Sequence, residues 1–289
     1  TIFPVGQFWV TLTTPELKYA LEHNHIVKIE QAVIYEQANI FKSYVDRFYA
    51  LRQEFKSAGV AEYEELCKKM LNSLYGKFGQ KAEVWEKVGE CPKERDRVEV
   101  CFLSNGGRTK MVRYLLGEIF ELKGYEESFN SFPAIASQVS AQARMYLWQL
   151  MQCAGEGNYF YCDTDSLIVN DDGLWNLWDL LDDVRLGGLK VVEKMPCLII
   201  KGLKDYVIGR KQVIKGIRKN AVETQAGVYE QEQWPSFKGL LRSDNAEDYI
   251  VKTVTKVLNR KYTKGHVTAN GSILPLHLDE PVESPLLFC

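Results

Sequence analysis

Several features that mark particular protein classes are scarce in this sequence of 289 residues. Its seven cysteines are odd in number and form no C-x-x-C pair, which argues against a disulfide framework and against a zinc ribbon. No apolar run approaches the ~20 residues that a membrane-spanning helix needs. The formal net charge is only −2, so the whole chain carries no strong excess of either sign. We therefore expect a protein of a reducing compartment, neither secreted nor embedded in a membrane.

What is present is the composition of a folded protein, with 46% apolar and 26% charged residues and no repeat or low-complexity linker. This length allows one large core or two modest ones. The sequence opens on Thr1 rather than Met, so we expect a fragment or a processed product.

Positive charge is distributed unevenly. Seven basic residues between Lys201 and Lys219 accompany a single acid, Asp205, and five more basic residues follow between Lys252 and Lys264. Each cluster is either a solvated face or a surface for nucleic acid phosphates, and for the second cluster both interpretations stay open.

The N-terminal part predicts a small α+β piece followed by a helical hairpin. Residues 7–12 and 26–35 have the composition of strands, and the helix between them has Thr14 as its expected N-cap. Two helices at 39–56 and 62–78 are separated by Gly59. On the second helix the apolar stripe that we expect to be buried consists of Tyr63, Leu66, Met70, Leu71, Leu74 and Phe78.

Further along, residues 81–131 have the mixed texture of a β-rich insertion, with a turn expected at SNGGR, residues 104–108. A helix is predicted over 133–153. A strand is expected within 197–217, and a basic helix near 246–261.

The stretch NYFYCDTDSLIV predicts a β-hairpin with Asp163 and Asp165 at its tip. On an extended backbone, residues i and i+2 lean toward the same face, so the two carboxylates would repel each other unless a cation lay between them. The alternatives are an ordinary turn, in which Asp bonds to nearby backbone, and a calcium loop, which Leu167 argues against because it occupies a ligand position. A turn or a magnesium site therefore remains.

On the helix at 62–78, Lys68, Asn72 and Tyr75 recur at i, i+4 and i+7 and so share one stripe. A cation, an amide and a phenol in line match a ligand with a charged end, a polar middle and a flat ring. An exposed helix face is the alternative interpretation.

Taken together, Lys68-x3-Asn72-Ser73-x-Tyr75-Gly76 and Tyr161-x-Asp163-Thr164-Asp165-Ser166 resemble two signature motifs of family B DNA polymerases, in the order in which that family has them. Lys204-Asp205-Tyr206 resembles the Lys-x-Tyr motif of the same family. The sequences LNSLYGKFG and YCDTDSLIV are most similar to those of the protein-primed branch, found in phages, linear plasmids and other mobile elements.

The resemblance implies an α+β right-hand polymerase with an antiparallel palm sheet, a catalytic β-hairpin, helical-hairpin fingers and a small thumb. It places part of the palm at 1–38, the fingers at 39–80, and an insertion at 81–131 that could serve processivity. The palm continues over 132–212, with the hairpin and the Lys-x-Tyr strand, and the thumb and C-terminal region occupy 213–289.

The function implied is template-directed nucleotidyl transfer from a dNTP to a primer 3′ hydroxyl, with two Mg²⁺ ions or Mn²⁺ as the alternative. Asp165, and after it Asp163, would be the catalytic metal ligands. The residues implied to bind the nucleotide are Lys68, Asn72, Tyr75, Lys56 and Arg52. Those implied to hold primer or DNA are Lys204, Tyr206, Lys201, Ser73, Gly76 and Thr164.

One family motif, Asp-x-x-Ser-Leu-Tyr-Pro-Ser, is not found in this sequence, and neither is an exonuclease domain. We therefore expect the C-terminal part of a polymerase that extends primers poorly alone. Its expected partners are primer-template DNA, dNTPs, a terminal protein primer and the missing N-terminal part. The expected location is the cytoplasm of a bacterial or viral host, or an organelle for a linear plasmid.

Two alternatives to a truncated enzyme are open: a non-catalytic nucleic-acid-binding remnant and one half of a split polymerase. A reverse transcriptase is disfavoured because its paired aspartates are adjacent, whereas Thr164 separates them here.

Overall fold

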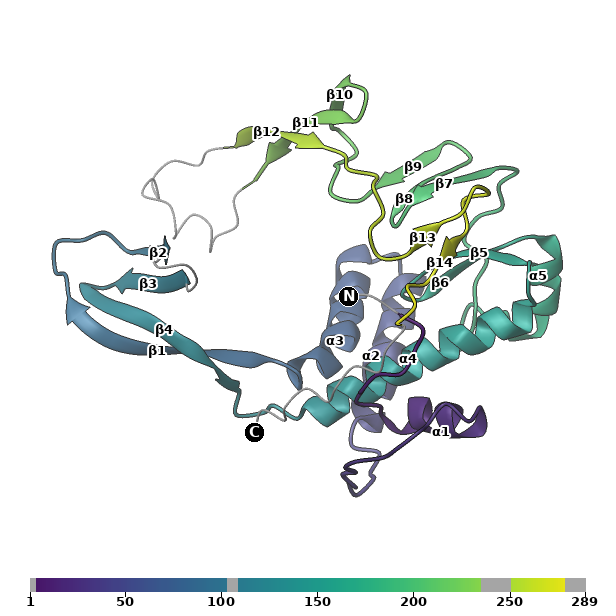
Figure 1. Ribbon diagram of the computed structural model, residues 1–289, viewed down its shortest axis with the longest axis horizontal. Coiled ribbons are helices and arrows are strands. Elements are labelled where there is room, and N and C mark those ends of the chain that lie inside the picture. The colour runs from purple at the N-terminus through teal and green to yellow at the C-terminus, as the bar shows by residue number, and fades with distance from the viewer. Residues whose placement is uncertain (1–3, 103–108, 235–250, 279–289) are drawn as a thin grey trace. The chain divides into compact units, whose positions relative to one another are not determined.

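A computed structural model of the chain describes residues 4–102, 109–234 and 251–278 (Figure 1). The chain divides into two compact units. The first comprises Thr1–Val10, Glu83–Glu126 and Met195–Cys289, and the second comprises Thr11–Ala82 and Glu127–Lys194. None of the helices in the described ranges combines the length and the apolar character that crossing a membrane requires.

The second unit is mainly helical. Helix α2 (Lys42–Ser57) and helix α3 (Ala61–Lys77) form the predicted hairpin, and Gly59 between them takes a φ of +72°, a left-handed conformation that glycine adopts without a Cβ clash. The predicted helix at 133–153 is α4 (Pro133–Ala154), which contacts both α3 and α1 (Thr14–Glu22).

Helix α1 is capped one residue earlier than predicted. Thr13, not Thr14, is its N-cap, and the Glu16 carboxylate accepts a hydrogen bond of 3.3 Å from the Thr13 backbone N–H. The same carboxylate accepts a 2.6 Å bond from the guanidinium of Arg144, which joins α1 to α4.

The apolar stripe predicted for α3 is only partly buried. Cys67 is buried, and Leu71 and Leu74 are half-buried at i+4 and i+7 from it, on the face that packs against α2. Tyr63, Leu66 and Met70 were expected to be buried but are exposed. One helix covers only a narrow strip of its neighbour, and Leu66 and Met70 lie at the flank of that strip. The Tyr63 ring stacks on Phe55 of α2 but stays exposed at the end of the stripe.

The predicted β-hairpin is present as β5 (Tyr159–Asp163) and β6 (Ser166–Val169). Strand β6 packs against α4 and α5 (Asp171–Asn176), and the short helix η1 (Trp178–Leu180) contacts α5. The core there is formed by buried Leu150, Ala154 and Leu177, against which Tyr159, Leu167 and Val169 pack.

In the first unit, the segment expected to be β-rich forms a four-stranded sheet of order β1-β4-β3-β2. Its strands are β1 (Lys81–Glu90), β2 (Arg97–Phe102), β3 (Thr109–Leu115) and β4 (Glu118–Glu127). The predicted SNGGR turn lies outside the described residues.

The rest of the first unit is also β-structure, with antiparallel pairing throughout its sheets. One three-stranded sheet contains β7 (Leu198–Gly202), β8 (Asp205–Ile208) and β9 (Lys211–Ile214). The second contains β10 (Val222–Gln225), β11 (Val228–Gln233) and β12 (Lys252–Val257), and β13 (His266–Val267) pairs with β14 (Ile273–Leu274).

Three secondary-structure predictions were wrong. Residues 7–12 and 26–35 are not strands, because a strand exists only where a partner pairs with its backbone, and residue composition reports propensity alone. The predicted basic helix is a strand over Lys252–Val257, where β-branched Thr253, Val254 and Thr255 pair with β11. The part of that prediction at 246–250 lies outside the described residues. The described chain mixes helices with antiparallel sheets, in agreement with the predicted α+β class.

Candidate functional site

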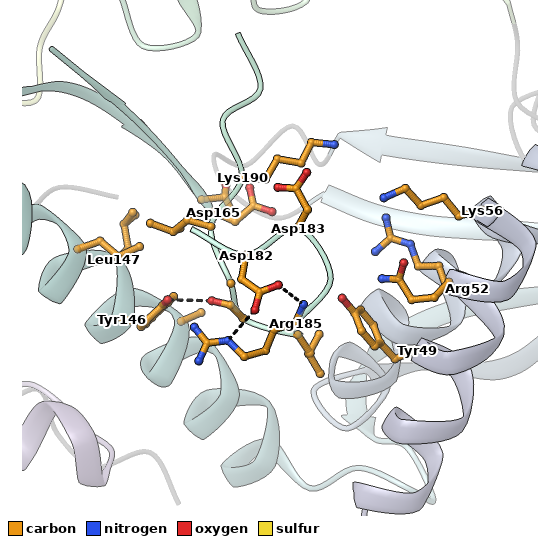
Figure 2. Close-up of a pocket in the computed structure, with 18 residues that line it drawn as sticks. Tyr49, Arg52, Lys56, Tyr146, Leu147, Asp165, Asp182, Asp183, Arg185 and Lys190 are labelled. Atoms are coloured by element: carbon orange, nitrogen blue, oxygen red, sulfur yellow. Dashed lines mark hydrogen bonds and ion pairs between the residues drawn. The ribbon is translucent and has the colours of Figure 1, made fainter. Parts of the chain in front are cut away.

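A cavity of about 440 Å³ lies within the second unit and is lined by α2, α4, the hairpin tip and the 182–190 loop (Figure 2). Its volume is in the range of small-molecule sites, about 300–1,000 Å³. Charged side chains of both signs line it. The acids are Asp165, Asp182 and Asp183, and the bases are Arg52, Lys56, Arg185 and Lys190.

The hairpin tip does not continue the extended backbone that the sequence predicted. Thr164 has a φ of +57°, and the backbone N–H of Asp165 bonds to the Asp163 carbonyl oxygen at 2.6 Å. Asp163 therefore ends strand β5, whereas Asp165 sits in the turn. The positive φ at a β-branched residue is a strained conformation, of the kind that often occurs at functional sites.

The two aspartates have different surroundings. Asp163 is half-buried, and its Oδ1 accepts a hydrogen bond of 3.1 Å from the Thr164 hydroxyl. Asp165 is exposed and lines the cavity together with Thr164, while Asp163 is not part of the lining. Burial raises the pKa of the neighbouring Cys162 thiol, and the Asp163 charge adds to this effect.

Helix α2 contributes Tyr49, Arg52 and Lys56 to the lining, at i, i+3 and i+7. Figure 2 shows Arg52 and Lys56 extending from α2 toward the cavity. The Arg52 Nη2 lies 3.5 Å from the Glu64 Oε1 of α3, while its Nε is buried and finds no hydrogen-bond acceptor among the described residues. An unpaired buried donor next to a cavity favours a ligand that carries oxygen acceptors.

Sequence reasoning missed the 182–190 loop. It is closed by a 2.8 Å bond from the Asp182 N–H to the Leu189 carbonyl oxygen. Within it, the Asp182 carboxylate accepts hydrogen bonds from the backbone N–H groups of Val184 at 2.9 Å and Arg185 at 2.8 Å. These two bonds, first that of Arg185, hold the pKa of the Asp182 carboxyl below its usual value. The available signal was the Gly187-Gly188 pair shortly after two aspartates, a turn composition.

Two tyrosines anchor this loop. The Tyr49 hydroxyl of α2 donates to the Val184 carbonyl oxygen at 2.7 Å, and the Tyr146 hydroxyl of α4 donates to the Gly187 carbonyl oxygen at 2.9 Å. The loop is therefore fixed to two different helices that line the same cavity.

The described residues contain no cluster of three or more His, Cys, Asp or Glu side chains suited to a metal ion. The hairpin offers two carboxylates. Mg²⁺ is commonly held by one or two carboxylates together with water and substrate phosphates, so the donor set of Asp163 and Asp165 fits this ion.

The predicted stripe of α3 lies apart from the cavity lining. Lys68, Asn72 and Tyr75 are all exposed, and the Lys68 ammonium pairs with Glu65 at 3.3 Å. Of the remaining residues predicted on α3, the Ser73 hydroxyl donates to the Met70 carbonyl oxygen at 3.4 Å. Apart from the nearby backbone of α3 itself, no atom of the described residues lies within 4 Å of the place where a Cβ on Gly76 would be.

The remaining predicted residues belong to the first unit. Lys201 is in β7 and Tyr206 in β8, with Lys204 in the turn between these strands. Lys204 has a φ of +53°, and its carbonyl oxygen accepts a 2.8 Å bond from the Lys215 N–H.

The first third of the chain, residues 1–97, matches a family model described as DNA polymerase type B, organellar and viral. A probable DNA polymerase of Podospora anserina is 25% identical over 310 residues, covering 96% of this chain and 25% of that protein. A probable DNA polymerase of Ascobolus immersus is 25% identical over 179 residues, covering 60% of this chain and 14% of that protein. The DNA-directed DNA polymerase of Enterobacteria phage PRD1 is 28% identical over 187 residues, covering 57% and 30%.

This chain thus spans between 14% and 30% of the length of these curated relatives. A solved structure of Phi29 DNA polymerase complexed with primer-template DNA and incoming nucleotide substrates is 20% identical and covers 76% of this chain and 30% of that one. Its TM-score of 0.34 is too low to establish a shared fold. The family model and the sequence relatives confirm the resemblance that the motifs predicted: this chain is similar to the type B DNA polymerases of organelles and viruses.

Proposed function

We propose that this chain carries part of the active site of a template-directed DNA polymerase, which transfers a nucleotide from a dNTP to a primer 3′ hydroxyl. The observation that carries the proposal is the cavity at which the Asp165 carboxylate of the hairpin meets the basic side chains of Arg52 and Lys56 from α2. The similarity to type B DNA polymerases supports the same activity.

Asp165, assisted by Asp163, would hold Mg²⁺ or Mn²⁺. When bound, such ions neutralise charge on the reacting phosphates and on the attacking and leaving oxygens. Asp165 is the firmer ligand in this proposal, because it is exposed to the cavity while Asp163 is half-buried and bonded to Thr164.

Arg52 and Lys56 bind the triphosphate of the incoming nucleotide. The guanidinium of Arg52 and the ammonium of Lys56 line the cavity and are donors to phosphate oxygens, and charge-assisted bonds of this type are the strong ones. The α3 stripe of Lys68, Asn72 and Tyr75 would contact the same nucleotide. In this role α2 and α3 are the fingers.

Polar and basic residues would hold the primer and the template. Lys204 and Tyr206 would contact the primer terminus, and Lys201 the adjoining backbone. Contacts of this kind set the position of the duplex and carry no sequence information, so the template is read by base pairing. Ser73, Gly76 and Thr164 complete the proposed DNA-contacting set. The β7–β9 sheet would belong to the palm and the following strands to the thumb.

A second candidate is DNA binding without catalysis, as a remnant or as one half of a split polymerase. The observation that favours it is the metal donor set, because the described residues provide two hairpin carboxylates and no cluster of three. A third carboxylate from another segment or another chain would then be required for activity.

The test is Mg²⁺-dependent primer extension by the complete gene product and by this 289-residue chain. Asp165→Asn should lower extension by about 100-fold or more while primer-template binding persists, because a lost metal ligand removes several kcal/mol of charge stabilisation. Asp163→Asn should cost less. The matched control is Asp172→Asn, an exposed aspartate of α5 outside the cavity, which should leave the rate unchanged.

Undiminished extension by the Asp165→Asn variant would refute the metal assignment. If the complete product binds primer-template DNA but no metal supports extension, the second candidate is correct.

A further inference from the structure

In the first unit, Asp205 is the charged side chain that is most deeply buried among the described residues. It is 9% exposed, and its Oδ2 accepts a hydrogen bond of 2.7 Å from the Nε of Arg260. The other carboxylate oxygen, Oδ1, is buried and has no hydrogen-bond partner in the described part of the chain. Arg260 is therefore the cation on which this carboxylate depends.

Arg260 connects two sheets through this bond. It follows β12, whereas Asp205 is the first residue of β8. Beside the pair lies Tyr229 of β11, which is 7% exposed. Burial raises the pKa of this phenol, and the Glu223 carboxylate of β10 adds to the effect. The β7–β9 sheet is thus joined to the β10–β12 sheet by a hydrogen-bonded ion pair with an aromatic side chain against it.

Asp205 is also the middle residue of Lys204-Asp205-Tyr206. Side chains alternate along a strand, so Tyr206 points to the face of β8 opposite that of Asp205 and Arg260. Lys204, directly before them, holds its left-handed turn with its carbonyl oxygen bonded to the Lys215 N–H. The tripeptide is therefore held at Lys204 by Lys215, which directly follows β9, and at Asp205 by Arg260.

We propose that Arg260 is a positioning residue for primer binding. Its ion pair with Asp205 fixes the backbone of the tripeptide and so sets the direction in which Lys204 and Tyr206 present their side chains. The inference rests on the proposed function for the roles of Lys204 and Tyr206. It makes the stretch after β12 a support for the primer-binding turn rather than a further DNA contact.

Whether Asp205→Asn raises or lowers the affinity for DNA shows whether Arg260 acts by positioning or by direct contact with DNA. Asp205→Asn removes a negative charge from a surface rich in basic residues, so electrostatics alone predicts tighter DNA binding. If Asp205 acts through Arg260, the same change loosens the turn and weakens binding. We expect the dissociation constant for primer-template DNA to rise about tenfold, the worth of one charge-assisted hydrogen bond.

The measurement is fluorescence anisotropy with labelled primer-template DNA over a series of salt concentrations, using the 289-residue chain and its variants. Arg260→Ala should weaken binding at least as much as Asp205→Asn, and Arg260→Lys should retain most of the affinity because it keeps the charge near Asp205. The matched control is Lys261→Ala, the exposed basic neighbour. That change should lower the affinity only slightly. If Arg260→Ala does not fold, as judged by circular dichroism, Asp205→Asn and Arg260→Lys carry the test.

Lys204→Ala distinguishes the two proposals. If Lys204→Ala leaves primer-template binding intact, the proposed role of the tripeptide fails. If Lys204→Ala weakens binding but folded Asp205→Asn binds as tightly as the unmodified chain or more tightly, the role of Arg260 is overturned. A fall of about one in the salt slope for Arg260→Ala, with Asp205→Asn unaffected, would likewise overturn it by showing a direct phosphate contact.

Discussion

The Tyr49 hydroxyl donates a 2.7 Å hydrogen bond to the carbonyl oxygen of Val184, 135 residues further along the chain. The equivalent bond from Tyr146 to Gly187 reaches the same loop from α4. Because the loop lines the cavity together with Asp165, the Tyr49 bond links α2, the helix proposed to bind triphosphate, to another part of the cavity wall.

Replacing Tyr49 by Phe should loosen the 182–190 loop without unfolding the unit. The ring keeps its packing, and only the hydroxyl bond is lost, at a cost of about 1 kcal/mol. Hydrogen exchange at backbone amides of the loop should become faster by about fivefold, as measured by mass spectrometry on the folded chain.

Tyr146→Phe is the matched variant, because it removes the second hydroxyl bond from the other helix. Its exchange pattern should centre on Gly187 rather than Val184. Equal exchange rates in the unmodified chain and both variants would mean that the loop is held by its internal bonds alone.

Replacing Lys56 or Lys68 tests two separate contacts with the nucleotide, each measured by the KM for dNTP. Lys56 lines the cavity, whereas Lys68 is on the exposed face of α3 with a surface ion pair to Glu65. Such a pair is worth little, so it leaves Lys68 available to a phosphate. In primer-extension assays, each change to Ala should raise the KM for dNTP about tenfold or more by removing one charge-assisted contact.

Lys69→Ala is the control, since its side chain is exposed on α3 next to Lys68 but outside the predicted stripe. Primer-template affinity should stay within about twofold of the unmodified enzyme in all three variants. A KM effect for Lys56 but none for Lys68 would show that the α3 stripe does not contact the nucleotide.

The sequence identified the helices and the hairpin because local patterns encode them. Apolar residues at helical spacing located α2, α3 and α4, and strand-forming runs on both sides of a polar break located β5 and β6. The order of three short motifs was sufficient to predict the resemblance to type B DNA polymerases. These patterns involve residues close together in the sequence, so they can be recognised in one sequence without a structure.

What could not be predicted depends on residues far apart in the chain. The 182–190 loop takes its place in the cavity through Tyr49 and Tyr146, and neither bond leaves a trace in the loop's own composition. The support of Asp205 by Arg260 is of the same kind. The turn at Thr164 was also missed, because a β-branched residue argues locally against a positive φ.

Two substitutions of similar size at the strained Thr164 turn should change the free energy of unfolding in opposite directions. Asn tolerates the left-handed region, so Thr164→Asn should raise the free energy of unfolding by up to about 1 kcal/mol. Thr164→Val keeps the branched Cβ and the strain but loses the hydroxyl bond to Asp163, so it should lower that free energy.

Urea denaturation followed by circular dichroism gives both values. The prediction fails if Thr164→Asn is the less stable of the two variants. Asn keeps the left-handed backbone at the tip but lacks the hydroxyl of Thr164. Primer extension with Thr164→Asn would therefore show in addition which of the two is needed.

Protonation of Asp182 should make the structure of the 182–190 loop sensitive to acid pH. The N–H groups of Arg185 and Val184 bond to its carboxylate and hold its pKa below the ordinary value of 3.8. A carboxyl with a depressed pKa in the folded state stabilises that state above the unfolded pKa, and this stabilisation is lost as the pH falls through the folded pKa. The loop should therefore keep its structure near neutral pH and loosen only below about pH 4.

The amide resonances of Val184 and Arg185 report this event directly in an NMR titration between about pH 6 and 2.5. Their midpoint should lie below 3.8, and Asp182→Asn should abolish the transition while keeping one acceptor oxygen for the loop. A midpoint at or above 3.8 would mean that the two backbone N–H groups do not hold the ionised carboxylate. In that case the loop would owe its shape to the tyrosine anchors and to the bond between Asp182 N–H and Leu189.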